Sequence, residues 1–190
     1  MRRSALIALI AAAPLAAVAN PFGVPASSGP SYDYIGGGYA NLNPDGSGSL
    51  DGFGIDGSVA LHENFHAMVD FVRGKDSPFT ARRTRVAGGY HMPLNPRTDF
   101  VARLGWSFSK SSVSGFGSFS DDGVLGQVGV RGMMSQALEL NAFLTYDDLA
   151  SKASVDVGGV YHFTPQFGAT GGYSYSSDLE VVNVGLRFQF

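Results

Sequence analysis

The chain has 190 residues, of which 26 are Gly, none is Cys and only 15% are charged, with a formal net charge of -3. Ordinary soluble domains carry about a quarter charged residues and about 7% Gly, so the composition argues against helical bundles, coiled coils and disordered tails. The lack of Cys excludes disulfides, zinc-thiolate sites, thiol catalysis and a lipid-anchored Cys. The slightly negative net charge gives no sign of the basic surface that nucleic-acid-binding proteins carry.

The N-terminal segment has the features of a cleaved secretory signal peptide. Arg2 and Arg3 precede a run of small and aliphatic residues over 5–18, and residues 17–19 read Ala-Val-Ala, a small-x-small cleavage pattern. The apolar run is shorter than the roughly 20 residues that a membrane-spanning helix needs. We therefore expect residues 1–19 to be removed, the Pro-rich residues 20–30 to form a flexible leader, and residues 31–190 to fold.

Alternation with a period of two runs through the rest of the chain. It is clearest in the last segment, where Val182, Val184, Leu186, Phe188 and Phe190 share one face and polar residues or Gly share the other. Such alternation predicts half-buried β-strands and fits no helix. The predicted strands are 31–41, 52–61, 65–74, 82–92, 99–109, 123–133, 138–147, 153–163, 167–176 and 180–190.

The connections between these strands are of two kinds. Three are long and rich in Gly, Ser and Asp, at 42–51, 75–81 and 110–122, whereas those near 62–64, 95–99, 135–137 and 164–166 are tight. Long connections at one rim and tight turns at the other are typical of an outer-membrane barrel, whose termini lie at the periplasmic rim. The predicted fold is all-β: a transmembrane antiparallel up-and-down barrel of about ten strands, with eight as the alternative. A secreted sandwich or lipocalin-like barrel is the competing interpretation.

The apolar phase of the strands carries aromatic residues near both ends and aliphatic residues between them. Rings prefer the headgroup depth of a bilayer, so two aromatic bands predict a lipid-facing outer surface. The predicted girdle residues are Phe65, Phe100 and Phe167 near the tight turns, with Trp106, Phe108, Tyr146 and Tyr175 near the long connections.

The polar phase carries acids and bases in equal number at mid-strand positions. An Arg facing lipid at the midplane costs about 2–4 kcal/mol, so these residues are predicted to face the lumen and to pair there. Buried pairs are not automatically stabilising, and we expect this network to fix strand register. The predicted lumen network is Asp56, Asp70, Glu139, Asp156, Arg85, Arg103, Arg131 and Arg187.

Two smaller features suggest functional hypotheses. Phe188 and Phe190 end an aromatic final strand of the kind by which outer-membrane precursors are recognised for insertion. His66 and His91 are predicted to face each other across a hairpin on the lumen side. The pair could bind a metal ion, respond to pH or simply fill the lumen, and no third ligand is apparent.

No pattern in the sequence points to catalysis. His62, His66, His91 and His162 all fall near the tight-turn end, so the opposite rim has no His for an acid-base or nucleophilic site. We predict a protein that is not an enzyme and has no cofactor.

Five short segments carry a likeness to a known family: 32–39 (YDYIGGGY), 52–60 (GFGIDGSVA), 64–66 (NFH), 98–103 (TDFVAR) and 129–131 (GVR). With these segments the chain resembles small outer-membrane barrels of OmpA/OmpX-like architecture. It looks more closely like a proteobacterial outer-membrane family once proposed as a quorum factor and elicitor of plant immunity. The resemblance implies an exported outer-membrane protein, and it transfers no catalytic residue.

The sequence thus predicts a monomeric, integral outer-membrane barrel of a Gram-negative envelope with a structural or surface-interaction role. Its expected partners are outer-membrane lipid, lipopolysaccharide, periplasmic chaperones and the barrel-insertion machinery, with no nucleic acid among them. Two alternatives stay open, a narrow channel for small solutes and a secreted β protein with a signalling or elicitor role.

Overall fold

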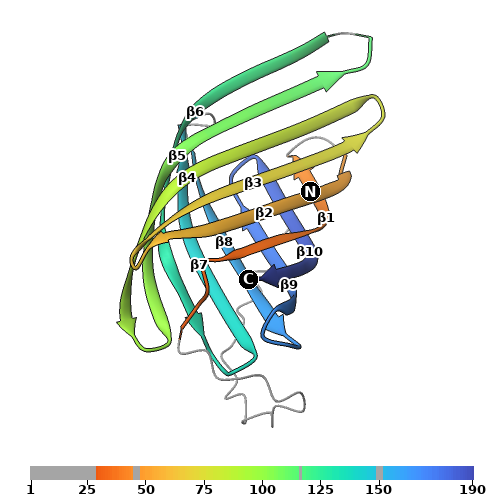
Figure 1. The fold of residues 1–190 in the computed structure, drawn as a ribbon. Coiled ribbons are helices and arrows are strands. Elements are labelled where there is room, and N and C mark those ends of the chain that lie inside the picture. Colours follow the sequence, from red (N-terminus) through yellow and green to blue (C-terminus); the bar gives the residue numbers. More distant parts are fainter. Residues whose placement is uncertain (1–28, 45–47, 116, 149–151) are drawn as a thin grey trace.

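The computed structural model describes residues 29–44, 48–115, 117–148 and 152–190. Ten antiparallel strands close into one barrel in which each strand pairs with its neighbours in sequence and the last pairs with the first (Figure 1). The predicted all-β barrel and its strand count of ten are confirmed. The predicted signal peptide and the leader up to residue 28 lie outside the described residues. No helix in the described ranges is long and apolar enough to cross a membrane.

The strands follow one another with short connections. Their bounds are β1 (Tyr34–Pro44), β2 (Leu50–His62), β3 (Phe65–Asp76), β4 (Phe79–Asn95), β5 (Thr98–Val113), β6 (Gly117–Met133), β7 (Leu138–Asp147), β8 (Lys152–His162), β9 (Phe167–Tyr175) and β10 (Leu179–Gln189).

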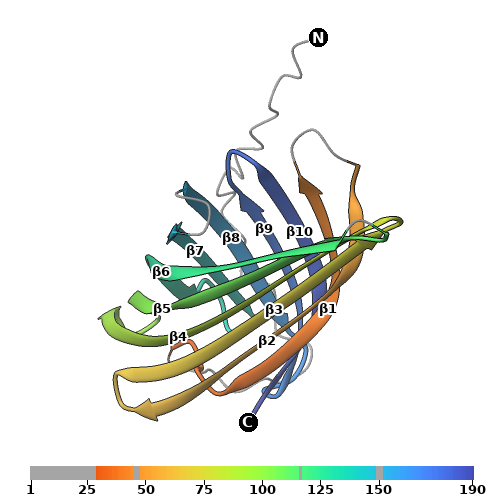
Figure 2. The same cartoon turned by 90° about the horizontal axis from the view of Figure 1, so that it is seen from above.

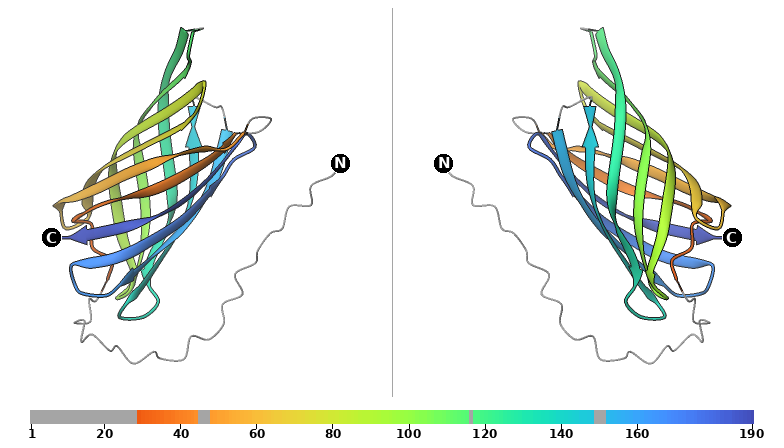
Figure 3. Two further views of the ribbon diagram at one scale, coloured as in Figure 1. Left: turned by 90° about the vertical axis from the view of Figure 1, so that its right-hand side faces the viewer. Right: turned by 90° about the vertical axis from the view of Figure 1, so that its left-hand side faces the viewer.

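The barrel has two unlike rims. The terminal rim holds the start of β1 and the end of β10, which pair as Tyr34 with Gln189, together with the turns at 63–64, 96–97, 134–137 and 163–166. The extended rim lies opposite, and the β5–β6 hairpin projects beyond its other strands (Figure 3). Figure 2 shows the same wall from above, with β1 and β10 side by side at the closure.

Two of the three predicted long loops are wrong. Strands β3 and β4 are joined by Ser77 and Pro78 alone, and β5 and β6 pair as far as Val113 with Gly117. The Ser-rich and Gly-rich segments lack the apolar alternation on which the prediction depended. Backbone pairing needs no apolar face once the strands have left the belt, so the ladders continue through 79–81 and 110–113.

The first strand begins at Tyr34, three residues later than predicted, and extends to Pro44. Residues 31–33 precede the strand, and Tyr32 does not belong to its alternation. Its side chain is only 5% exposed and lies inside the terminal mouth of the barrel.

The wall has an apolar outer face and a mixed inner face. Large apolar side chains such as Leu104, Val184 and Leu186 are 55–69% exposed on the outside. The interior holds buried Arg, Glu and His together with a small apolar cluster of Leu42, Leu50, Val72, Val181 and Ala40. This is the reverse of a soluble barrel, whose apolar phase points inward.

Candidate functional site: the barrel lumen

One carboxylate organises the terminal half of the lumen. Glu139, at the start of β7, is fully buried and accepts two hydrogen bonds from Arg131 on β6, at 2.6 Å from Nε and 3.1 Å from Nη2. Arg187 on β10 donates to the same carboxylate at 3.4 Å, and His162 Nε2 lies 4.0 Å from it. A carboxylate between two guanidinium groups is a charge-assisted arrangement that ties together strands far apart in the barrel order.

Two tyrosines close this half around the arginines. The guanidinium of Arg187 lies 3.9 Å from the ring centre of Tyr34, and that of Arg131 lies 4.9 Å from Tyr32 and 5.2 Å from Tyr34. The Tyr32 hydroxyl donates to Asp99 at 2.9 Å. Burial raises the pKa of this hydroxyl, so it keeps the proton that it donates. The aromatic faces therefore cover the charges on the side of the terminal mouth.

The two predicted lumen histidines do meet, although not in the predicted register. His66 pairs across the ladder with Gly89, and His91 lies diagonally from it, because the turn centres between Ser77 and Pro78. Their Nδ1 atoms are nevertheless 3.4 Å apart, and Arg103 Nε donates to His66 Nε2 at 3.0 Å. Among the described residues no group of three or more His, Cys, Asp or Glu could hold a metal ion. A guanidinium beside His66 also opposes a bound cation.

Hydrogen bonds continue from this cluster toward the extended half. Arg103 Nη1 donates to Gln127 at 2.7 Å, and Gln127 Nε2 donates to Thr145 at 2.8 Å. The Thr145 hydroxyl donates to Asp156 at 2.5 Å. This series of hydrogen bonds runs from β5 to β8, so each side chain fixes the rotamer of the next.

The lumen contains a cavity of about 250 Å³. Its lining includes Asp56, Asp70, Arg83 and Arg85, and it reaches Arg131 and Arg187 of the terminal half. Arg85 Nη2 lies 3.4 Å from Asp147, whereas Asp70 Oδ1 is buried and has no hydrogen-bond partner within the described part of the chain. The cavity thus lies between the charge cluster around Glu139 and the apolar cluster of Leu42, Leu50 and Val72.

The structure places all eight residues of the predicted charge network inside the barrel, but it does not pair them all. Arg131 and Arg187 share Glu139, and Arg187 also reaches Asp56 at 3.5 Å. Arg103, by contrast, bonds to neutral groups, His66 and Gln127. All members of the network except Glu139 line the cavity.

Sequence reasoning missed several lumen residues. Asp147 and Arg83 could have been found, because they continue the inward phase of Glu139 and Arg85 by even steps. His162 shares the phase of Asp156 in the same way. Asp99 and Tyr32 were harder to find, since one begins a strand and the other precedes one. The missed residues include Tyr32, Tyr34, Arg83, Asp99, Gln127, Thr145, Asp147 and His162.

The predicted girdle residues all lie on the outer face. Five of them, Phe65, Phe108, Phe167, Tyr146 and Tyr175, are 46–51% exposed, and Trp106 is 43% exposed. Phe100 is half-buried. Phe188 packs against Phe167 across the β9–β10 ladder with ring centres 4.9 Å apart, and Phe190 is 68% exposed at the terminal rim.

Comparisons with known proteins find likeness in structure only. No protein-family model and no curated protein matches the chain. Similar solved structures include Ail, the attachment invasion locus protein of Yersinia pestis, at 15% identity over 83% of this chain and 95% of that one, with a TM-score of 0.43. The KdgM porin is 12% identical over 83% of this chain and 99% of that one, with a TM-score of 0.49. The outer membrane protein OprG from Pseudomonas aeruginosa is 12% identical over 83% of this chain and 94% of that one, with a TM-score of 0.44.

The likeness to these solved structures is one of fold alone. Identities of 12–15% and scores below 0.5 are too low to transfer an activity, a ligand or a cellular compartment to this chain.

Proposed function

We propose that this protein is a non-enzymatic, integral β-barrel of a Gram-negative outer membrane. In this proposal the barrel is a rigid scaffold that presents its extended rim, and above all the β5–β6 hairpin, at the cell surface. The charged lumen is a structural core that holds the barrel in register.

The inverted polarity of the barrel wall carries the proposal. Leu104, Leu186 and other large apolar side chains point away from the interior, while Arg131 and Glu139 are buried within it. In water such an outer surface would form an apolar patch far larger than soluble proteins tolerate. A closed barrel satisfies its backbone groups without water and is one of the two architectures that can cross a bilayer.

The filling of the terminal half supports a scaffold rather than an open pore. Glu139, Val101 and Val160 are at most 1% exposed, and Tyr32 covers the charges at the mouth. Ten strands enclose more space than the eight that side chains readily fill. Arg and Tyr side chains occupy that extra width here.

Fractionation with heat-modifiable migration tests the proposal. The outer-membrane fraction should contain a band that migrates faster before boiling than after it, as folded barrels do. An epitope inserted at Ser114–Gly115, in the turn of the β5–β6 hairpin, should be accessible on intact cells, whereas one between Pro96 and Arg97 should not. Recovery in culture medium free of vesicles would instead favour the secreted alternative.

A narrow channel is the second candidate, and the lumen cavity favours it. Its volume of about 250 Å³ has room for several water molecules among Arg and Asp side chains. Single-channel recording in planar bilayers separates the candidates. A scaffold gives no steady openings, while a channel gives openings that change in ion selectivity when Arg83 is replaced by Gln.

The final strand is the proposed signal for the insertion machinery. Phe188 and Phe190 lie on the outer face at the terminal rim, next to the β1–β10 closure. Replacing both by Ser should leave the exported precursor with periplasmic chaperones, detected as unfolded protein in the periplasmic fraction.

A further inference from the structure

The Lys and Arg side chains of the barrel lie in three regions: the lumen, the terminal rim and the outer face near the extended rim. Of the Lys and Arg side chains that the structure describes, five line the lumen and Arg97 lies in a turn of the terminal rim. All the others face outward near the extended rim on three neighbouring strands: Arg73 and Lys75 on β3, Arg82 on β4 and Lys110 on β5.

Three of these cations form one row across the sheet. Arg73 is the direct cross-strand partner of Arg82, and Arg82 is the direct partner of Lys110. We call Arg73, Arg82 and Lys110 the basic row. Their outward direction follows from their neighbours, since Val72 and Gly74 on either side of Arg73 are buried.

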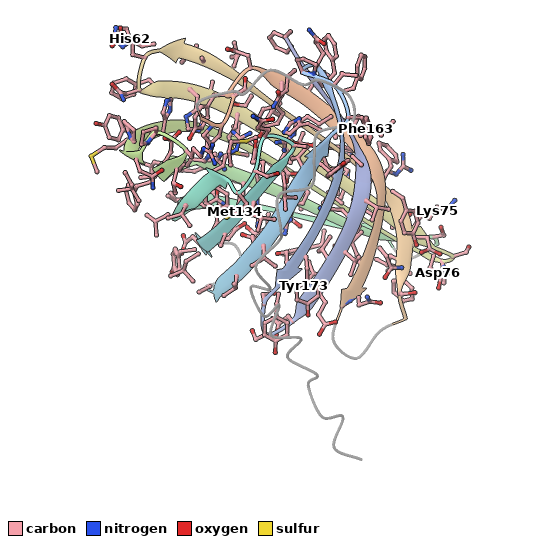
Figure 4. All side chains as sticks on the ribbon, turned by 90° about the horizontal axis from the view of Figure 1, so that it is seen from below. His62, Lys75, Asp76, Met134, Phe163 and Tyr173 are labelled. Carbon is pink, nitrogen blue, oxygen red and sulfur yellow. The ribbon has the colours of Figure 1, made fainter. Side chains whose placement is uncertain are left out.

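The basic row has no counterion of its own. No ion pair links any of its three members to a carboxylate within the described ranges, and like charges placed directly opposite each other across a ladder are destabilising. Asp122 on β6 is opposite Phe108 and accepts a hydrogen bond from Trp106 Nε1 at 2.8 Å. Lys75, one step further out, faces Asp51 and is labelled at the tip of β3 in Figure 4.

The row lies directly above the aromatic band of the extended rim. The next outward position on each strand toward the belt is Phe71, Thr84 and Phe108, which are themselves direct partners. A hollow of about 340 Å³ lies between the two layers. Phe71, Arg82, Phe108 and Lys110 line it together with Asp121 and Asp122 on its β6 side. Rings of this kind occupy headgroup depth, so the cations sit at the level of lipid phosphates.

We propose that the basic row binds the phosphate groups of a phosphorylated glycolipid of the lipid A type in the outer leaflet. This inference rests on the proposed function, because it needs a membrane-embedded barrel with its extended rim outside. Arg forms forked hydrogen bonds with phosphate oxygens, and a bound dianion removes the repulsion within the row. The half-buried rings below the row contact the sugar and the first methylene groups of the lipid.

Binding is measured on the full mature barrel in phosphatidylcholine vesicles, with the fluorescence of Trp106, the only tryptophan, as the probe. Bisphosphorylated lipid A is expected to change the emission in a saturable way that weakens with salt. Each exposed cation near an anionic membrane surface contributes about a fivefold gain in affinity, so the R73Q/R82Q/K110Q variant should bind about a hundredfold more weakly.

A matched pair of single variants controls for charge alone. Arg82→Gln should weaken binding about fivefold, whereas Arg97→Gln, at the opposite rim, should leave it unchanged. Because removal of the row relieves repulsion, the triple variant should fold and resist urea as well as the parent in vesicles that contain phosphatidylcholine only. This result shows that a loss of binding does not come from unfolding.

Three outcomes would overturn the inference: equal binding of dephosphorylated lipid A, unchanged binding by the triple variant, or competition by millimolar inorganic phosphate that matches lipid A. In each case heat-modifiable migration of the barrel in vesicles would still support the proposed function. Failure of the parent chain to insert into any vesicle would reject the proposed function itself.

Discussion

The terminal and extended halves of the lumen accommodate buried charged side chains in different ways. In the terminal half, Arg131 and Arg187 both donate to Glu139 and lie against the Tyr34 ring. In the extended half, Asp70 and Arg83 line the cavity, and the interior beyond it is apolar, formed by Leu42, Leu50 and Val72. Buried charges thus occur in both halves, but the carboxylate shared by two guanidinium groups is in the terminal half, whereas the unpaired oxygen of Asp70 lies beside the cavity.

This difference teaches where the register of the barrel is fixed. Breaking a buried ion pair is costly because the remaining charge stays uncompensated, whereas a carboxylate beside a cavity can be solvated. The terminal half should consequently be the stable part of the barrel, and changes in the extended half should be tolerated.

Of the substitutions that test this difference, Glu139→Gln should have the largest effect on stability. The change leaves Arg131 buried without a carboxylate and Arg187 with Asp56 alone, and it should lower the free energy of unfolding by about 3–5 kcal/mol. Urea titration of the barrel in vesicles, followed by Trp106 fluorescence, measures the loss. A loss below about 1 kcal/mol would show that the terminal half is not the anchor.

Tyr32→Ala removes the cover of the terminal mouth. It deletes a buried ring and leaves Asp99 without its donor, and it should cost about 3 kcal/mol, within the range for aromatic truncations. It should also raise conductance in planar bilayers if the terminal half is the barrier. Leu50→Ala, at the other end of the lumen, is the matched control and should leave conductance unchanged.

Two inward-facing glycines compare the packing of the halves directly. A Cβ at Gly89 would lie 2.3 Å from the His66 ring and 3.0 Å from Arg103, whereas a Cβ at Gly54 would lie 3.5 Å from its nearest neighbour, the carbonyl oxygen of Phe71. Gly89→Ala should therefore destabilise the barrel by about 1–3 kcal/mol through overpacking, and Gly54→Ala by less than about 0.5 kcal/mol. Equal urea midpoints for the two variants would contradict the packing difference.

Asp156→Asn should have the smallest effect. Asn still accepts the hydrogen bond from Thr145, and the neighbouring cavity allows the side chain to adjust. We expect a loss of about 1 kcal/mol or less, typical of a single hydrogen bond that is weakened rather than removed. A loss as large as that of Glu139→Gln would mean that both halves carry buried charge in the same way.

Much of this architecture could be predicted from the sequence because a lipid-facing strand leaves a strong signal. Ten alternating segments identified ten strands, and the inward phase placed Arg131 and Glu139 in the lumen. Strand ends were harder to predict, because outside the belt the ladder of β5 and β6 needs no apolar face. The partners of the lumen ion pairs could not be predicted either. The stagger of the strands, and not the spacing along the sequence, brings Arg85 to Asp147 and Arg187 to Glu139.

The closure of the barrel has a consequence for the order of folding. Tyr34 pairs with Gln189 and Pro44 with Leu179, so the first strand finds one of its two neighbours about 145 residues away. Contacts at such sequence separation are the slowest to form. Until they do, β1 and β10 are two unprotected edges that can pair with other chains. Nascent chains of this protein should therefore depend on chaperoning until the last strand has been made.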